Sequence, residues 1–225
     1  MKFAIKIFII YLLVFASSSC SEDKSSFNFS RKIQTLFKGT KNVTLSPNEM
    51  KEFVVNMDNG LLKSKVIGEV TYSVKYKPVD YIISQELKGT SIDMNSYKQK
   101  YSELSGMQYF DLRVEIDKQN GELLKYGLNT VDEYERRVKY LAFDINTDIQ
   151  LIDGEDTLQC VMNHFERVYD IVPYATILLG FKDNGKSQLK EKTIVFHDKL
   201  FGKGIIKFTF LPSDLQNIPH LEVIS

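Results

Sequence analysis

The stretch ATILLGFKDNGKSQLKEKTIVFH, residues 175–197, holds two apolar runs on either side of a polar centre. β-Branched and aromatic side chains dominate both runs, which is typical of strands. Asn184-Gly185 lies between them, and this dipeptide is a leading short-range signal for a two-residue hairpin. The stretch therefore predicts two strands joined in a β-hairpin, with Lys182 and Lys186 in solvent at the turn.

The same stretch contains the phosphate-binding pattern G-x-x-x-x-G-K-[ST] at Gly180, Gly185, Lys186 and Ser187. Such a loop binds phosphate when a helix follows it, because the N-terminus of that helix adds positive potential. Here only residues 188–192 separate the loop from the next apolar run, which leaves too little chain for that helix. We therefore expect a turn and no nucleotide as cofactor or partner.

The rest of the second half has the same character. From about residue 142, short apolar runs such as GIIKFTF, residues 204–210, alternate with the turn signals Asp153-Gly154 and Gly202-Lys203-Gly204. Short strands separated by tight turns are typical of antiparallel sheets. This half therefore predicts an antiparallel β-sheet or a sandwich of hairpins.

The first half mixes helices with two strands. Ser46 with Glu49, and Thr130 with Glu133, form capping-box patterns before predicted helices. Further helices are expected over residues 78–87 and 94–104, the latter because its apolar residues recur at helical spacing. Residues 70–76 and 110–116 alternate apolar with polar side chains, as half-buried strands do. The fold class is therefore α+β, with helices mainly in the first half.

Composition excludes one class of partner. The chain has 225 residues, of which 43% are hydrophobic and 26% charged, as in ordinary globular proteins. Lys+Arg and Asp+Glu balance at 29 each, so no net charge would attract nucleic acid. We expect no nucleic-acid partner.

The first residues form a secretory signal. Lys2 and Lys6 precede the unbroken apolar run IFIIYLLVFA, residues 7–16, and small residues then lead to Cys20. The run is too short to span a membrane. The pattern resembles the signal of bacterial lipoproteins, although Ser17 stands where the usual pattern has Leu. The resemblance implies that Cys20 receives lipid and becomes the mature N-terminus.

Two further stretches extend the resemblance. The tripeptide SED after Cys20 resembles the acidic tag that sends lipoproteins of Bacteroidota to the cell surface, and residues 60–82 look like uncharacterised envelope proteins of that group. The resemblance implies a lipid-anchored position at the outer membrane, on the cell surface or the periplasmic face, and brings no known activity. It divides the chain into a signal peptide at 1–19, Cys20 with a polar tether at 20–40, and a single α+β domain at 41–225.

Residues 144–155, DINTDIQLIDGE, carry part of a calcium-loop pattern. Asp144, Asn146, Asp148 and Glu155 occupy ligand positions of that pattern. The position that needs Gly for a sharp turn is Ile149, which fits a strand entering a hairpin better. We therefore expect no metal here, with these four residues as the calcium candidates.

Three other features of the second half bear on chemistry. The tripeptide DTL around Thr157 resembles the short O-glycosylation motif of Bacteroidota envelope proteins, so Thr157 is the candidate glycosylation site. Cys160 is the only thiol besides Cys20, and a lone Cys is most often a small buried apolar residue. The histidines do not complete a zinc-ligand pattern; they are His164, His197 and His220.

No complete catalytic constellation is present in the sequence. We therefore expect a lipid-anchored component of the cell envelope that binds or supports other molecules, with an envelope protein or a glycan as its partner besides the membrane. Two alternatives stay open. One is a secreted or surface hydrolase that uses dispersed Asp and Glu, which need not be close in sequence. The other is a calcium-stabilised adhesin.

Overall fold

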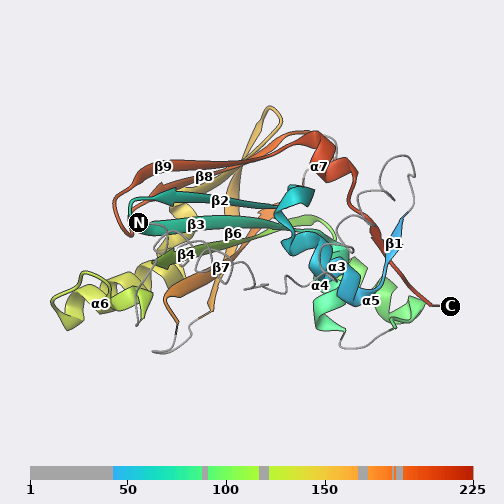
Figure 1. Cartoon of the computed structure of the whole chain (residues 1–225), viewed down its shortest axis with the longest axis horizontal. Coiled ribbons are helices and arrows are strands. Elements are labelled where there is room, and N and C mark those ends of the chain that lie inside the picture. The colour runs from blue at the N-terminus through green and yellow to red at the C-terminus, as the bar shows by residue number, and fades with distance from the viewer. Residues whose placement is uncertain are drawn as a thin grey trace, which may run out of the picture. The chain divides into compact units, whose positions relative to one another are not determined.

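The computed structural model describes residues 43–87, 91–116, 122–166, 172–183, 185 and 190–224. Asn42–Ser225 forms one compact unit. Its fold is α+β, as the sequence predicts, with most helices before residue 140 and mostly antiparallel strands after it (Figure 1).

One sheet of eight strands dominates the described residues. Every neighbouring pair in it is antiparallel. In spatial order the strands are β2 (Leu62–Ile67), β3 (Val70–Lys77), β4 (Met107–Ile116), β7 (Tyr174–Lys182), β6 (Asp156–Glu166), β5 (Ile149–Asp153), β8 (Lys192–Asp198) and β9 (Gly204–Phe210). A second, parallel pair joins β1 (Thr44–Leu45) to β10 (His220–Leu221).

The sheet curls until its two edge strands, β2 and β9, lie close together (Figure 1). No backbone ladder joins these edges among the described residues. A side-chain contact bridges them instead, since Lys65 Nζ lies 5.8 Å from the ring centroid of Phe208 on β9. Lys63 Nζ on β2 also lies 3.2 Å from Asp214 Oδ2, in helix Pro212–Gln216 that follows β9. The sheet is therefore nearly a closed barrel. We call the line where β2 faces β9 the β2–β9 seam.

Large side chains fill the inside of the curled sheet. Inward residues alternate with outward ones along each strand, and the alternation predicted for residues 70–76 and 110–116 is confirmed. An eight-stranded sheet closed on itself leaves room only for such side chains. The largest fully buried aromatic residues are Tyr72, Phe110, Phe181, Phe196, Phe208 and Phe210.

Five α-helices lie outside this sheet in the described part of the chain. Both predicted capping boxes form, at Ser46–Glu49 and at Thr130–Glu133. The last predicted helix continues through a π-helical turn, Tyr140–Asp144, and a 3-10 turn, Ile145–Asp148. The helices are α3 (Pro47–Val55), α4 (Val79–Glu86), α5 (Met94–Leu104), α6 (Val131–Lys139) and α7 (Pro212–Gln216).

Helix α5 forms where helical spacing predicts it, but its apolar stripe does not enter the core. Met94 is 39% exposed and Tyr101 is 43% exposed. Tyr97 Oη donates a hydrogen bond to Asp80 Oδ1 on α4 at 2.7 Å, which attaches one side of the helix. Periodicity predicts that a helix has an apolar side, whereas the packing of the neighbouring elements decides whether that side is covered.

The predicted hairpin within residues 175–197 is wrong. β7 pairs with β4 and β6, and β8 pairs with β5 and β9, so two strands lie between β7 and β8. A local turn does form, since Gly185 has φ +69° and its N–H donates to Asp183 Oδ1 at 3.0 Å. Turn chemistry sets the local backbone but not the partner of the next strand. Lys182 is exposed, as expected, and Lys186 lies outside the described residues.

The other turn signals of the second half do join paired strands. Gly154, with φ +63°, lies in the two-residue turn between β5 and β6. Gly202 and Gly204, with φ +67° and +80°, lie at the β8–β9 turn. Both hairpins confirm the antiparallel sheet predicted for this half.

The capping box of α3 provides a test of local stability. Ser46 Oγ accepts a hydrogen bond from Glu49 N, and Glu49 Oε2 accepts one from Ser46 N at 3.0 Å. Ser46→Ala should lower the free energy of unfolding by about 0.5–2 kcal/mol, because the first helical turn loses an acceptor. Chemical denaturation measures this. Ser102→Ala, at an exposed position within α5, should leave stability unchanged or slightly higher; equal losses in both variants would contradict the role of the cap.

Candidate functional site

The structure does not bring the four calcium candidates together. Asp144, Asn146 and Asp148 lie in the helical turns that precede β5, and Glu155 lies in the turn after it. The five residues of β5 separate the two groups, and at ~3.3 Å per residue they span about 17 Å. The four residues therefore do not form one calcium loop. The predicted strand entering a hairpin is present in its place.

Asp148 has partners within the protein. It accepts a hydrogen bond from Tyr140 Oη at 3.0 Å, and Lys199 Nζ lies 2.7 Å from its other carboxylate oxygen. Burial, followed by the charge of Asp148, raises the pKa of the Tyr140 hydroxyl. The ammonium of Lys199 supplies a positive charge at the carboxylate. These contacts tie the β8–β9 turn to the helical turns before β5.

The phosphate-binding pattern lies in a setting that differs from that of a phosphate loop. Strand β7, which contains Gly180, is antiparallel to both of its neighbours. A Cβ at Gly180 would lie 2.9 Å from the terminal Cε atoms of Met107 and of Met162, so these two side chains pack closely over the glycine. Ser187 lies outside the described residues, and β8 already begins at Lys192. The described part of the pattern is the end of a sheet strand.

The structure describes two of the three remaining candidate residues, Thr157 and Cys160, but not Cys20. Thr157 lies on β6, paired with Ile152, and its side chain is exposed. Glycosylation of Thr157 stays a prediction. Cys160 is buried, as expected, and burial raises the pKa of its thiol. Cys20 lies outside the described residues.

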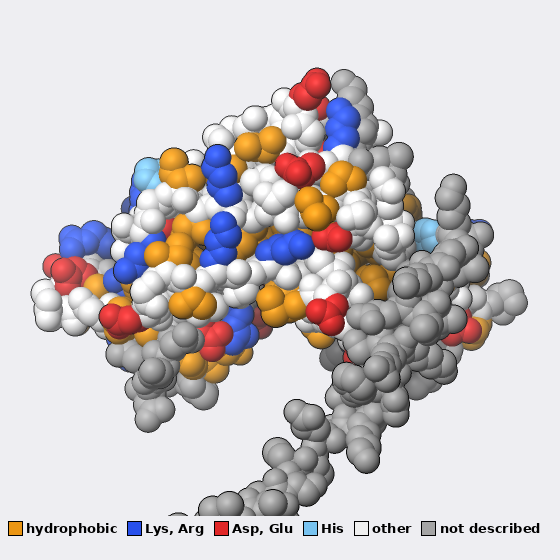
Figure 2. Space-filling view, turned by 45° about the horizontal axis from the view of Figure 1, so that its top comes forward, with side chains coloured by type: hydrophobic (Ala, Val, Ile, Leu, Met, Phe, Trp, Pro, Cys, Tyr) orange, Lys and Arg blue, Asp and Glu red, His pale blue; other side chains and the backbone are white. Residues whose placement is uncertain are grey.

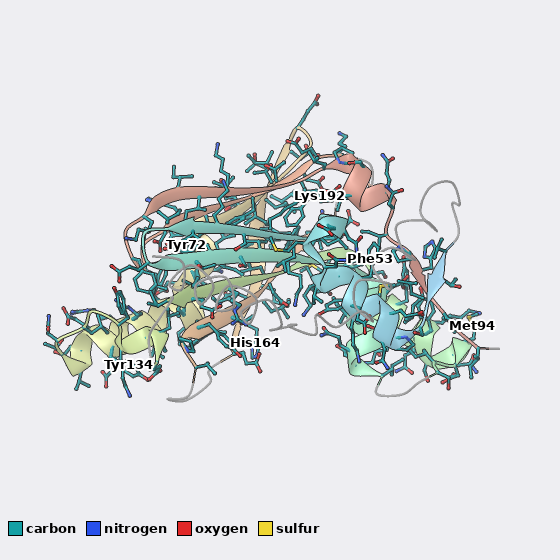
Figure 3. The ribbon with its side chains drawn as sticks, viewed as in Figure 1. Phe53, Tyr72, Met94, Tyr134, His164 and Lys192 are labelled. Atoms are coloured by element: carbon teal, nitrogen blue, oxygen red, sulfur yellow. The ribbon has the colours of Figure 1, made fainter. Side chains whose placement is uncertain are left out.

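The three histidines lie on different elements. His164 on β6, labelled in Figure 3, and His197 on β8 are both exposed. His220 Nδ1 lies 3.4 Å from Asp80 Oδ2. Within the described ranges, no group of three His, Cys, Asp or Glu side chains is placed to hold a metal ion.

Two buried polar centres inside the curled sheet were not anticipated from the sequence. The first, the Lys192 centre, consists of Lys192, Asp153 and Gln108. Lys192 Nζ lies 2.9 Å from Asp153 Oδ1, and Gln108 Nε2 donates to Asp153 Oδ2 at 2.8 Å. The side chains of Lys192 and Asp153 are only 3% and 0% exposed. Such a pair is stable only while each charge keeps its partner.

The second, the Asp198 centre, lies at the opposite end of the sheet, as the labels of Tyr72 and Lys192 indicate (Figure 3). Asp198 Oδ2 accepts hydrogen bonds from Tyr72 Oη at 2.7 Å and from Lys203 N at 3.0 Å. Asp198 Oδ1 accepts from the backbone N–H groups of Leu200 and Phe201. One carboxylate therefore organises the β8–β9 turn and anchors it to β3.

Alternation along β8 is the signal that could have revealed both centres. Ile194 and Phe196 are inward core residues, and side chains two positions apart point to the same face of a strand. The same parity places Lys192 and Asp198 inside the sheet. A charge at each end of an otherwise apolar inward row therefore marks a buried polar contact.

The aromatic cluster beside the Lys192 centre contains a perturbed tyrosine. Tyr76 packs on Phe110 and Phe210, with ring centroids 5.2 and 6.3 Å away. Burial, followed by the negative charges of Asp183 and Asp153, raises the pKa of Tyr76 to about 12. Tyrosinate is therefore disfavoured at this position in the folded state.

In the described ranges, four carboxylates are buried, and all of them accept hydrogen bonds from neighbours that hold the fold together. Each links elements or segments that are separate in sequence. They are Asp80 with Tyr97 and Leu221, Glu122 with Tyr134, Asp153 with Gln108, and Asp198 with Tyr72. Their arrangement serves structure, and it assigns none of them to acid–base chemistry on a substrate.

The β2–β9 seam carries exposed lysines next to exposed apolar side chains. Lys65, Lys203 and Lys207 are exposed there, and none of them belongs to an ion pair of the described residues. Val66 is 64% and Ile205 is 66% exposed beside them. Figure 2 shows Lys and Arg side chains spread over this face, with hydrophobic side chains between them. The seam combines positive charge, apolar contacts and unpaired strand edges.

Comparison with known proteins adds no further assignment. No protein-family model matches the chain, and neither a curated protein nor a solved structure matches it.

Removing one charge from the Lys192 centre should be costly. Lys192→Met leaves the Asp153 carboxylate buried without its cation, and we expect a loss of about 3–5 kcal/mol in the free energy of unfolding. The double variant Lys192→Met with Asp153→Leu should recover most of this loss, because no charge stays buried. Chemical denaturation of the single and double variants measures both effects.

The matched control is the partly exposed pair that joins β2 to α7. Lys63→Met breaks the pair of Lys63 with Asp214, whose side chains are 29% and 23% exposed, so its cost should stay below about 1 kcal/mol. Similar losses for Lys63→Met and Lys192→Met would contradict the difference in burial that the structure assigns to the two lysines.

Tyr76 should make stability depend on alkaline pH. Its pKa in the unfolded chain is about 10, and in the folded state it is about 12. Because the folded-state pKa is raised, the stabilisation is fully present below pH 10 and is lost as the pH rises through 12. Urea denaturation between these values should show a shallower fall in stability for Tyr76→Phe than for the wild type. Tyr101→Phe, at a ring 43% exposed, should keep the wild-type slope; identical slopes for all three proteins would refute the assignment.

Proposed function

We propose that the chain is a lipid-anchored protein of the cell envelope whose folded body acts as a binding or structural component. The observation that carries the proposal is the N-terminal pattern of Lys2 and Lys6, an apolar run over residues 7–16, and Cys20 after small residues. No helix in the described part of the chain is long and apolar enough to cross a membrane. Attachment through acyl chains on Cys20 is the form of membrane association that we propose.

The sequence between Cys20 and the body supports an anchor. Residues 21–42 lie between Cys20 and the first described residue, Val43. Residues 21–30 are polar and poor in aliphatic side chains, which suits a tether. The body would then lie close to the outer membrane, on the cell surface, within reach of an envelope protein or a glycan.

Several features of the body support a binding role over a catalytic one. Aromatic side chains fill the interior of the sheet, and the buried carboxylates are engaged in structural hydrogen bonds. At the β2–β9 seam, the exposed lysines Lys65 and Lys207 flank strand edges that are unpaired among the described residues. Charged and apolar groups gathered at one exposed place are typical of a surface that meets a partner.

The anchor is tested by replacing Cys20 with Ala in the native host. We expect the wild-type protein to fractionate with membranes and to incorporate a labelled fatty acid, and the variant to lose both properties. Cys160→Ala is the matched control and should keep both. Membrane association of the wild type without any acyl label would refute the anchor. The intact mass of the same wild-type sample also reports on Thr157, since a mass equal to peptide plus lipid would exclude a glycan there.

A further inference from the structure

The free edge of β2 carries a defined row of backbone groups. Tyr76 N donates to Leu61 O at 2.8 Å, so this pair is hydrogen-bonded. Bonded and non-bonded pairs alternate along an antiparallel ladder. The register of β2 with β3 therefore directs the N–H and C=O groups of Leu62, Ser64 and Val66 away from β3, toward the seam. This row is a template for one more strand.

The charges at the seam restrict which strand could pair there. Lys65 points to the inner side of the edge strand, with its ammonium over Phe208, while Lys203 and Lys207 are exposed near β9. Asp214, beside them, is already paired with Lys63. Inward-pointing charges on an edge strand disfavour pairing with a neutral apolar edge. The same edge of a second copy of this chain would place lysine against lysine, and repulsion between these like charges excludes it as the occupant.

The same lysines are complementary to carboxylates. Specificity of this kind arises when one charge pattern both attracts the right partner and repels the wrong ones. No backbone ladder joins β2 to β9 among the described residues, so a strand that pairs with β2 here replaces no existing ladder. An extended segment with acidic side chains can hydrogen-bond to the outward backbone groups of β2 and also pair its carboxylates with the lysines. A polyanion without backbone amides can pair only with the lysines.

We propose that the β2–β9 seam binds an extended acidic segment of a partner polypeptide, which adds as a strand to the edge of β2. The amides of the segment bond with Leu62, Ser64 and Val66, and the carboxylates on its inner face lie near Lys65. This inference deepens the binding role proposed above by naming the class of partner. Its binding test does not require the lipid on Cys20.

The experiment measures binding of short fluorescent peptides to the purified full chain by fluorescence anisotropy. A peptide of alternating Glu and Val should bind, and added salt should weaken the binding. A peptide of alternating Lys and Val forms strands but has the wrong charge. A peptide of alternating Glu and Pro keeps the charge but lacks half of the amides and cannot add to a sheet. Both controls should bind about tenfold more weakly or worse.

Two variants locate the site on the protein, each with a matched control. Lys65→Glu should weaken binding of the Glu–Val peptide about tenfold or more, whereas Lys98→Glu, the same change at an exposed position on α5, should have little effect. Val66→Pro removes an N–H that points to the free edge and leaves the bonds to β3 in place, so it should also weaken binding. Val66→Ala retains that N–H and should bind nearly as well as the wild type.

Three outcomes would overturn the proposal. They are absence of binding by the Glu–Val peptide, equal binding of the Glu–Pro peptide, and equal loss in Lys65→Glu and Lys98→Glu. If Val66→Pro does not fold, the comparison of the two acidic peptides on the wild-type protein decides the question alone. If no peptide binds but Cys20 is acylated in cells, the seam proposal is rejected and the lipid anchor is retained. If the Glu–Val peptide binds as expected but Cys20 is not acylated, the anchor is rejected and the seam proposal is retained.

Discussion

The packing of Phe110 against rings from three other strands is the interaction on which the rest of the fold depends. Its ring centroid lies 5.2 Å from that of Tyr76 on β3, 5.7 Å from Phe181 on β7 and 5.6 Å from Phe210 on β9. The first two strands are direct neighbours of β4, but β9 is at the far edge of the sheet. A ring contact between β4 and β9 requires the sheet to curl, because only curvature brings those inner faces together.

Curling the sheet creates the features that distinguish this molecule. It places β2 beside β9 and leaves two strand edges that side chains bridge without a backbone ladder. It also encloses the charges at the two ends of β8, which then require the partners found at Asp153 and Tyr72. Burial of charge and exposure of strand edge are both consequences of the same closure, and both are costly unless matched by complementary groups.

Local patterns were reliable where the interacting residues are close in sequence. Ser46 with Glu49 capped a helix as expected, since the two residues need only three peptide units to meet. The helix over residues 94–104 also formed, but its Met94 and Tyr101 stayed exposed, because no neighbouring element covers them among the described residues. The Asn184-Gly185 signal predicted a hairpin wrongly, although Gly185 has the left-handed backbone that turns often need. A strand also separates Glu155 from the other three calcium candidates, at which we expected no metal.

Local patterns in the sequence were sufficient to predict the capping boxes of α3 and α6, the two-residue alternation of β3 and β4, and the α+β class. All of these depend on hydrogen bonds or side-chain preferences within a few residues. Only the tertiary structure decided that β7 and β8 do not pair, that Lys192 and Asp198 are buried with their partners, and that β2 and β9 face each other across a lysine-bearing seam. Those outcomes follow from how the inner faces of distant strands fit together, and no short stretch of chain contains that information.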